Sequence, residues 1–210
     1  MTVRNRTTRG HVSSEHIVQF FDSDESRARN VAAFLAEGFA AGERLLVVAR
    51  PANVTAIFKQ LEVLGVPVAA AVESGMLLAK DAEETLRRLT YQGMPDAALF
   101  DARVGEEARA LASQGRIRAY GEMVDILARR GEVDAAIKLE GLWNDLAERV
   151  SLFLMCGYSA AHFVSTSTHR ALLDICRAHS GVHRDARDPL GDWLLNAAHN
   201  SAASSSSLRH

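Results

Sequence analysis

Two runs of consecutive apolar residues constrain the fold of this chain more than any other feature. Arg44–Ala49 reads RLLVVA and Leu152–Tyr158 reads LFLMCGY. A strand with one face in water alternates apolar and polar side chains, whereas a strand of a parallel sheet is covered on both faces and is apolar throughout. Segments with helical spacing of apolar residues separate these runs. This alternation predicts an α/β fold, a three-layer sandwich with a mostly parallel central sheet.

The remaining elements follow from the same periodicities. Apolar and β-branched segments predict further strands at His16–Phe21, Val66–Val72, Met76–Ala79 and Ile117–Tyr120. Capping residues, Pro and Gly signals and apolar spacing predict helices over residues 25–41, 51–64, 81–91, 96–114, 122–130, 133–150 and 168–179. The first of these helices has Asp22 or Ser23 as its cap.

One segment imitates a strand that ends in a catalytic aspartate. Ala97–Asp101 reads AALFD, but Pro95-Asp96 before it is a helix start signal, and Phe100 begins a series of apolar residues at helical spacing. We therefore expect a helix here, with Asp101 on its solvated surface.

Composition excludes several classes of protein. The chain has 210 residues, 48% of them hydrophobic, and a formal net charge of -2, which gives no general attraction to nucleic acid or anionic membrane. No apolar run approaches the roughly 20 residues that span a bilayer. Cys156 and Cys176 are too few for a disulfide scaffold, and reduced thiols indicate a cytoplasmic protein.

The chain divides into three parts by composition. Residues 1–14 are polar and carry Arg4, Arg6 and Arg9 without a hydrophobic period, so we expect a disordered arm. Residues 15–180 hold the alternating pattern and form one domain. Residues 181–210 are mostly polar and end in SAASSSSLRH, which predicts a tail.

The usual nucleotide and metal motifs are absent. The loop after the first predicted strand reads FFDSDES, with no glycine, no lysine and three carboxylates that repel phosphate, whereas a P-loop needs glycines and a lysine. There is no Gly-x-Ser-x-Gly elbow. The histidines, among them His162, His169 and His179, have no zinc-site spacing such as HExxH. We therefore expect no cofactor and no metal.

Two glutamates are the best candidates for a site. Glu122 follows Gly121 where a strand passes into a helix, the edge at which open α/β sheets bind ligands, although a first-turn glutamate favoured by the helix dipole is an equal alternative. Glu140 lies near the apolar arc of its helix, where a buried carboxylate needs a partner. Asn144, one turn on, suits the same network.

Other side chains are weaker candidates. Trp143 on the same helix is more often core than ligand platform. His16 begins the first strand and can reach the sheet edge, but a lone histidine is usually not a ligand. Phe21 and Asp22 end the first strand, where they offer apolar contact and a hydrogen-bonding carboxylate.

These residues carry a resemblance to a known family. His16-x-x-x-Phe20-Phe21-Asp22-Ser23-Asp24, Gly121-Glu122-Met123-Val124 and Leu139-Glu140-x-x-Trp143-Asn144 resemble the MEDS domain, the sensory domain of methanogen and methylotroph proteins and of the dichloromethane repressor DcmR. The resemblance covers roughly residues 14 to 180. It implies a fold similar to the RecA/KaiC ATPases without their P-loop, and a role in sensing small, hydrocarbon-derived ligands.

The resemblance also implies partners. Family members are often fused to a histidine kinase or a DNA-binding domain, and neither tail of this chain has the length for one. We therefore expect a stand-alone, non-enzymatic regulator that acts through a signalling protein, a histidine kinase or transcriptional regulator, without direct contact to nucleic acid or membrane. A homodimer is left open.

Three functional hypotheses follow, in decreasing order of support. The first is a sensor that binds a small ligand, such as a C1 or hydrocarbon-derived compound, through His16, Phe21, Asp22, Glu122, Glu140, Trp143 and Asn144. The second is a protein-interaction module without a small ligand, in a kinase or sigma-factor system, which an exposed apolar patch favours. The third is an enzyme that uses Glu122 and Glu140 as acid and base, for which no nucleophile, metal set or cofactor motif is present.

Overall fold

The structure, a computed structural model, describes residues 14–163 and 169–182 of the chain. In this part all six strands of the main sheet are parallel, in the order β3-β2-β6-β7-β1-β8. Their bounds are β1 Glu15–Phe21, β2 Arg44–Ala49, β3 Leu77–Asp81, β6 Ile117–Gly121, β7 Leu152–Ser159 and β8 Gly181–Val182. A short antiparallel hairpin, β4 (Thr90–Tyr91) with β5 (Met94–Pro95), lies outside this sheet.

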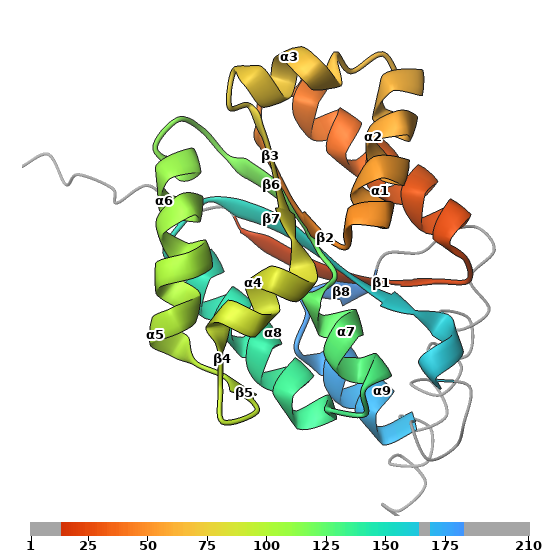
Figure 1. Cartoon of the computed structure of the whole chain (residues 1–210), viewed down its shortest axis with the longest axis vertical. Helices are drawn as coiled ribbons and strands as arrows, with labels where there is room; N and C mark the ends of the chain where they lie inside the picture. Colours follow the sequence, from red (N-terminus) through yellow and green to blue (C-terminus); the bar gives the residue numbers. More distant parts are fainter. Residues whose placement is uncertain (1–13, 164–168, 183–210) are drawn as a thin grey trace, which may run out of the picture.

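Helices cover both faces of the sheet and make a three-layer α/β sandwich, as predicted (Figure 1). One face carries α1 (Asp24–Ala40), α2 (Pro51–Val63) and α3 (Val68–Glu73). The other face carries α4 (Ala82–Leu89), α5 (Ala97–Phe100), α6 (Glu106–Ala112), α7 (Met123–Arg129), α8 (Val133–Ala147) and α9 (His169–Arg177). The likeness to RecA/KaiC ATPases stays a prediction.

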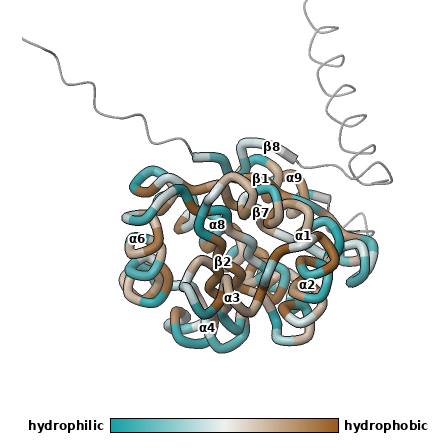
Figure 2. The backbone as a smooth tube through the Cα atoms, turned by 90° about the horizontal axis from the view of Figure 1, so that it is seen from above, coloured by the Kyte–Doolittle hydropathy of each residue, from teal (hydrophilic) through white to brown (hydrophobic). Residues whose placement is uncertain are grey.

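Alternation along each strand divides the core in two. On β1, Val18 and Phe20 pack in the cluster beneath α4–α9, whereas Phe21 packs in the cluster beneath α1–α3. Successive side chains of a strand point to opposite faces, so His16 shares the face of Val18 and Phe20. In Figure 2 the backbone at the centre of the molecule is largely hydrophobic (brown), and hydrophilic segments (teal) lie mostly at the periphery of the molecule.

Local signals place the helices as the sequence predicts in most cases. Ser23 caps α1, and its hydroxyl and that of Ser26 form a reciprocal capping box. Gly42 and Gly65 follow α1 and α2 with φ of 73° and 83°, a left-handed conformation that glycine adopts without strain. Strand β2 has the predicted bounds.

Other predictions are corrected by the structure. Val66–Val72 is not a strand, because α3 begins at Val68, directly after Pro67 at its N-cap position. The helix predicted over residues 51–64 ends at Val63, and Leu64, its C-cap residue, is 52% exposed. The predicted helix from residue 96 contains a π-helical turn at Asp101–Gly105.

The structure describes only part of the two predicted terminal segments. Gly181 and Val182, which the sequence assigns to the tail, pair with β1 as strand β8. The predicted arm, apart from Ser14, and the rest of the predicted tail lie outside the described residues. No helix within the described part of the chain has the length and apolar character needed to cross a bilayer.

Close packing at Gly157 on β7 gives a first prediction. A Cβ at this position would lie 2.6 Å from Tyr120 Oη and 2.8 Å from Phe21 Cε2, and both rings are buried. We expect Gly157→Ala to lower the free energy of unfolding by about 1–3 kcal/mol, because the rings have no free space to enter. Urea denaturation measures this change.

Gly141 on α8 provides the matched control. A Cβ there meets nothing within 4 Å, and the position is exposed in a helix interior. Gly141→Ala should raise the free energy of unfolding by up to about 1 kcal/mol, since alanine has the higher helix propensity. Equal effects of the two substitutions would contradict the packing described for Gly157.

Candidate functional site

A first group of polar side chains surrounds Glu122, between β6 and α7. Its carboxylate is 0% exposed and accepts hydrogen bonds from the backbone N–H of Arg50 (2.5 Å), Arg50 Nε (2.8 Å) and Asn53 Nδ2 (2.7 Å). Arg50 and Asn53 belong to the start of α2, directly after β2. The buried carboxylate therefore joins the carboxyl ends of two neighbouring strands.

Asp125 on α7 extends this group to β7. Its carboxylate is also 0% exposed, and it accepts hydrogen bonds from Arg50 Nη2 and from the backbone N–H of Ser159, both at 2.8 Å. His162 Nε2 lies 3.5 Å from Asp125 Oδ1 without forming a hydrogen bond. We name this group the edge cluster: Arg50, Asn53, Glu122, Asp125, Ser159 and His162.

Electrostatics set the protonation of the edge cluster. Burial alone would lower the pKa of Arg50, but the carboxylates of Glu122 and Asp125 outweigh it and raise that pKa, so the guanidinium stays charged. Burial lowers the pKa of His162, and Asp125 only partly opposes this effect. His162 is therefore a neutral imidazole near pH 7, with a side chain that is 24% exposed.

A second group of polar side chains surrounds Glu140 on α8. It lies on the sheet face that α4–α9 cover. The Glu140 carboxylate is 0% exposed; Oε1 accepts a hydrogen bond from Tyr158 Oη at 2.7 Å, and Oε2 one from Cys156 Sγ at 3.2 Å. His16 Nε2 lies 3.3 Å from Oε2, and His179 Nε2 lies 3.3 Å from Oε1. We name this group the Glu140 cluster: His16, Glu140, Asn144, Cys156, Tyr158 and His179.

Both imidazoles of the Glu140 cluster are fixed by contacts of their Nδ1 atoms. His16 Nδ1 lies 2.8 Å from Asn144 Oδ1, and Asn144 Nδ2 donates to the carbonyl oxygen of Ala178 at 2.8 Å. His179 Nδ1 lies 2.7 Å from the carbonyl oxygen of Ile175. These contacts orient the two rings, whose centroids are 4.2 Å apart, with both Nε2 atoms toward Glu140.

The charge of Glu140 governs the titration of its neighbours. Burial is the largest influence on its pKa and raises it, but His179 and His16 together outweigh burial and hold the pKa well below its usual range. The pKa of His179 is raised because Glu140 outweighs the desolvation of the imidazole. Burial, reinforced by the carboxylate, raises the pKa values of Cys156 and Tyr158.

The seven residues predicted to form one site do not all come together. His16, Glu140 and Asn144 meet in the Glu140 cluster, whereas Glu122 belongs to the edge cluster. The Glu140 cluster lies near the amino end of β1, because His16 is the second residue of that strand. A single ligand-binding site of all seven residues therefore remains a prediction without structural support.

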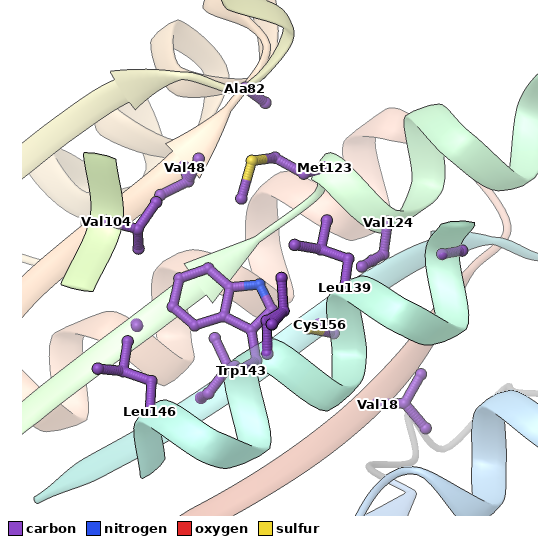
Figure 3. Close-up of a cluster of buried hydrophobic side chains, with 14 of the residues drawn as sticks. Val18, Val48, Ala82, Val104, Met123, Val124, Leu139, Trp143, Leu146 and Cys156 are labelled. Atoms are coloured by element: carbon purple, nitrogen blue, oxygen red, sulfur yellow. The ribbon is translucent and has the colours of Figure 1, made fainter. Parts of the chain in front are cut away.

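Three of these residues lie elsewhere. Asp22 is exposed between β1 and α1. Phe21 packs beneath α1–α3, on the opposite face from His16. Trp143 is 1% exposed and stacks edge-on against Phe100, with ring centroids 5.1 Å apart, inside the apolar cluster drawn in Figure 3.

Sequence reasoning missed several members of both clusters. Asp125, Arg50 and His162 carry no motif, and the only local signal for them is their position just after strands or in a first helical turn. Cys156 lies in the apolar run Leu152–Tyr158, and Figure 3 draws it within the apolar cluster, yet its Sγ also contacts Glu140. His179 has no zinc-site spacing to another histidine, so its part in the Glu140 cluster has no sequence signal.

Two surface depressions lie beside α4. They are lined by charged side chains, among them Glu84, which forms exposed ion pairs with Arg87 and with Arg88. Neither contains a residue of the edge cluster or of the Glu140 cluster. The edge cluster and the Glu140 cluster are therefore the candidate sites of the described part of the chain.

The fold and the clusters define an open-sheet α/β protein without a P-loop, with buried polar groups on two parts of its sheet. The model of the MEDS family, the methanogen/methylotroph, DcmR sensory domain, matches residues 15–180. The chain belongs to this family of sensory domains, and the predicted resemblance is confirmed. Among curated proteins nothing matches the chain.

Glu122 gives a prediction about the edge cluster. Glu122→Ala leaves the amide of Asn53 and part of the Arg50 guanidinium without their buried acceptor. We expect the free energy of unfolding to fall by about 3 kcal/mol, as for other broken buried ion pairs, with Asp125 moderating the loss. Chemical denaturation followed by circular dichroism measures it.

Glu106 on α6 is the control for this substitution. Its side chain is exposed, so Glu106→Ala should change stability by less than about 0.5 kcal/mol. A loss below about 1 kcal/mol in Glu122→Ala would show that the carboxylate is not an essential link between β2 and β6.

Proposed function

We propose that this chain is a non-enzymatic regulatory domain that binds a small polar ligand at the edge cluster and signals through a protein partner. The observation that carries the proposal is the arrangement of Arg50, Asp125 and His162 at the carboxyl ends of β2, β6 and β7. Open α/β sheets bind ligands at this edge. Membership of a sensory family supports the same conclusion.

The edge cluster has groups for recognition and few for catalysis. Glu122 and Asp125 are both committed to Arg50, so neither is available as a free base. The guanidinium of Arg50, 18% exposed, and the neutral imidazole of His162 offer hydrogen bonds to a small molecule. A C1 compound or another hydrocarbon-derived molecule that carries an oxygen or a halogen fits this chemistry.

An interaction module without a small ligand is the alternative function. It is favoured by three exposed apolar side chains at the end of α2 and in α3, namely Val63, Leu64 and Val72, which are 74%, 52% and 47% exposed. A dimer in native mass spectrometry that Leu64→Asp converts to a monomer would support this alternative. In either case the output would pass to a histidine kinase or a transcriptional regulator.

His162→Ala tests the proposed ligand site. Because His162 Nε2 has no hydrogen-bond partner among the described residues, the substitution should change the stability of the unliganded domain by less than about 0.5 kcal/mol. A compound that stabilises the wild-type domain in a thermal-shift screen of C1 compounds and small oxygenated metabolites should bind the variant at least about tenfold more weakly, a loss of about 1.4 kcal/mol.

Tyr91→Ala is the matched control, since Tyr91 is an aromatic residue, 63% exposed, in the β4-β5 hairpin, which contributes no residue to the edge cluster. It should leave ligand affinity unchanged. If every compound leaves the melting temperature of the wild-type domain unchanged, or if His162→Ala binds as well as wild type, the proposed ligand site is wrong.

A further inference from the structure

The Glu140 cluster brings together four side chains of the types that bind transition metals. His16, Glu140, Cys156 and His179 come from β1, α8, β7 and the turn after α9, and one ligand atom from each lies within 4.8 Å of all the others. All four side chains are buried: Glu140 and Cys156 are 0% exposed, His16 is 4% exposed and His179 is 9% exposed. This group lies apart from the edge cluster and has no part in the proposed function.

Hydrogen bonds fix the tautomers of both histidines. The carbonyl oxygen of Ile175 can only accept, so His179 Nδ1 carries the proton and donates it. The carbonyl oxygen of Ala178 likewise requires the amide nitrogen of Asn144, which leaves Asn144 Oδ1 to accept from His16 Nδ1. In the neutral rings, both Nε2 atoms therefore direct lone pairs toward Glu140. Metal-binding histidines are commonly held in this way, with the other nitrogen bonded to a carbonyl or carboxylate.

The interior of the cluster has more acceptors than donors. With neutral rings, two imidazole lone pairs face the carboxylate of Glu140. The donors directed at these acceptors are the Cys156 thiol and the Tyr158 hydroxyl. Tyr158 is bound to Oε1, and the thiol has both His16 Nε2 and Glu140 Oε2 at 3.2 Å but can donate to one. His179 Nε2 has no hydrogen-bond partner among the described residues. Buried acceptors facing each other repel unless a proton or a metal ion lies between them.

A divalent cation resolves this deficit with balanced charge. A proton on His179 Nε2 would pair that ring with Glu140 Oε1 at 3.3 Å, whereas protons on both rings would place two positive charges 4.2 Å apart against one carboxylate. One divalent ion with a glutamate carboxylate and a cysteine thiolate is neutral overall, and both histidines remain neutral ligands. Balanced charge is what a site without solvent exposure requires.

The separations of the ligand atoms also fit a metal ion. Tetrahedral Zn²⁺ with bonds of about 2.0 Å to nitrogen or oxygen and 2.3 Å to sulfur places its ligand atoms about 3.3 to 3.6 Å apart. The corresponding separations from His16 Nε2 are 3.3 Å to Glu140 Oε2 and 3.2 Å to Cys156 Sγ. His179 Nε2 lies 3.3 Å from the other carboxylate oxygen. The other ligand atoms lie within 4.8 Å of one another, so the side chains that are farthest apart would move closer on binding.

We propose that His16, Glu140, Cys156 and His179 form a closed, four-coordinate site for Zn²⁺ or a similar transition-metal ion. Binding displaces the thiol proton of Cys156 to solvent and forms bonds from its thiolate, the two Nε2 atoms and a Glu140 oxygen to the metal. Imidazole and thiolate ligands select such an ion over Mg²⁺ and Ca²⁺, which prefer oxygen. The four protein ligands leave no open position for catalysis, so the site is structural or sensory.

Metal binding would connect the last helix to the sheet. His179 follows α9, and Ser180 beside it is already held to His16, with Ser180 Oγ donating to the His16 carbonyl at 2.7 Å. A metal shared by His16 and His179 would fix the end of α9 against β1. Metal occupancy would then control how firmly the C-terminal helix packs on the domain.

The test uses the full chain, stripped with a chelator and titrated with Co²⁺ as a spectroscopic substitute for Zn²⁺. We expect one ion per chain, visible d–d bands of tetrahedral intensity and a near-ultraviolet thiolate-to-cobalt band. Zn²⁺ should displace Co²⁺ and raise the melting temperature, whereas Mg²⁺ should do neither. Cys156→Ser should lose the thiolate band and weaken affinity more than about 100-fold, and Asn144→Ala should weaken it about 10–100-fold through the loss of support for His16.

Cys176→Ser is the matched control, because Cys176 is the second cysteine of the chain and is not a proposed ligand. It should retain the full spectrum. His162→Ala, the variant that tests the edge cluster, should also retain it, so that failure of the ligand site and failure of the metal site are distinguishable. Circular dichroism verifies that each variant is folded, and the wild-type titration stands whether or not Cys156→Ser folds.

Two results would overturn the proposal. One is a folded wild-type protein that shows no tetrahedral cobalt spectrum and retains less than about a tenth of an equivalent of metal. That result would make the cluster an ion pair between Glu140 and a protonated His179. The other is a spectrum that persists in Cys156→Ser and disappears in Cys176→Ser.

Discussion

The structure depends on the neutralisation of carboxylates that have no contact with solvent. Glu122, Asp125 and Glu140 are each 0% exposed. A charge in such a position costs several kcal/mol unless neighbouring groups compensate for it. The compensating groups are far away in the sequence: Arg50 is 72 residues from Glu122, and His16 is 124 residues from Glu140. The carboxylates therefore fix how distant segments of the chain meet, in addition to the apolar packing of the two core clusters.

The sequence predicts the architecture because that architecture follows from short-range patterns. The apolar run Arg44–Ala49 becomes β2 with the same bounds, and Ser23 caps α1 as its position indicates. Val66–Val72 is interpreted wrongly because a short apolar segment has the same periodicity in a buried strand and in a short helix. The position of Pro67, directly before α3, was the available signal for a helix start.

The candidate sites are only partly predictable, for a different reason. Glu140 and Asn144 are four residues apart on one helix, so helical spacing alone places them together. His16 and Cys156 are 140 residues apart and contact each other because β1 and β7 are neighbours in the sheet with Val18 opposite Cys156. Strand order and register are long-range properties that no local pattern contains. For the same reason, zinc-site spacing in the sequence is a poor test for a site assembled from four separate elements.

The edge cluster and the Glu140 cluster share one strand. On β7, Cys156 and Tyr158 contact Glu140, and the backbone N–H of Ser159 donates to Asp125. Cys156, Tyr158 and Ser159 are all paired with β1 in one parallel ladder, so that a shift at one of them strains the pairing of the others. A ligand that alters the bond between Ser159 and Asp125 thus acts on the strand that positions the Glu140 cluster. This continuity gives the domain a physical connection between the edge cluster and the segment after α9.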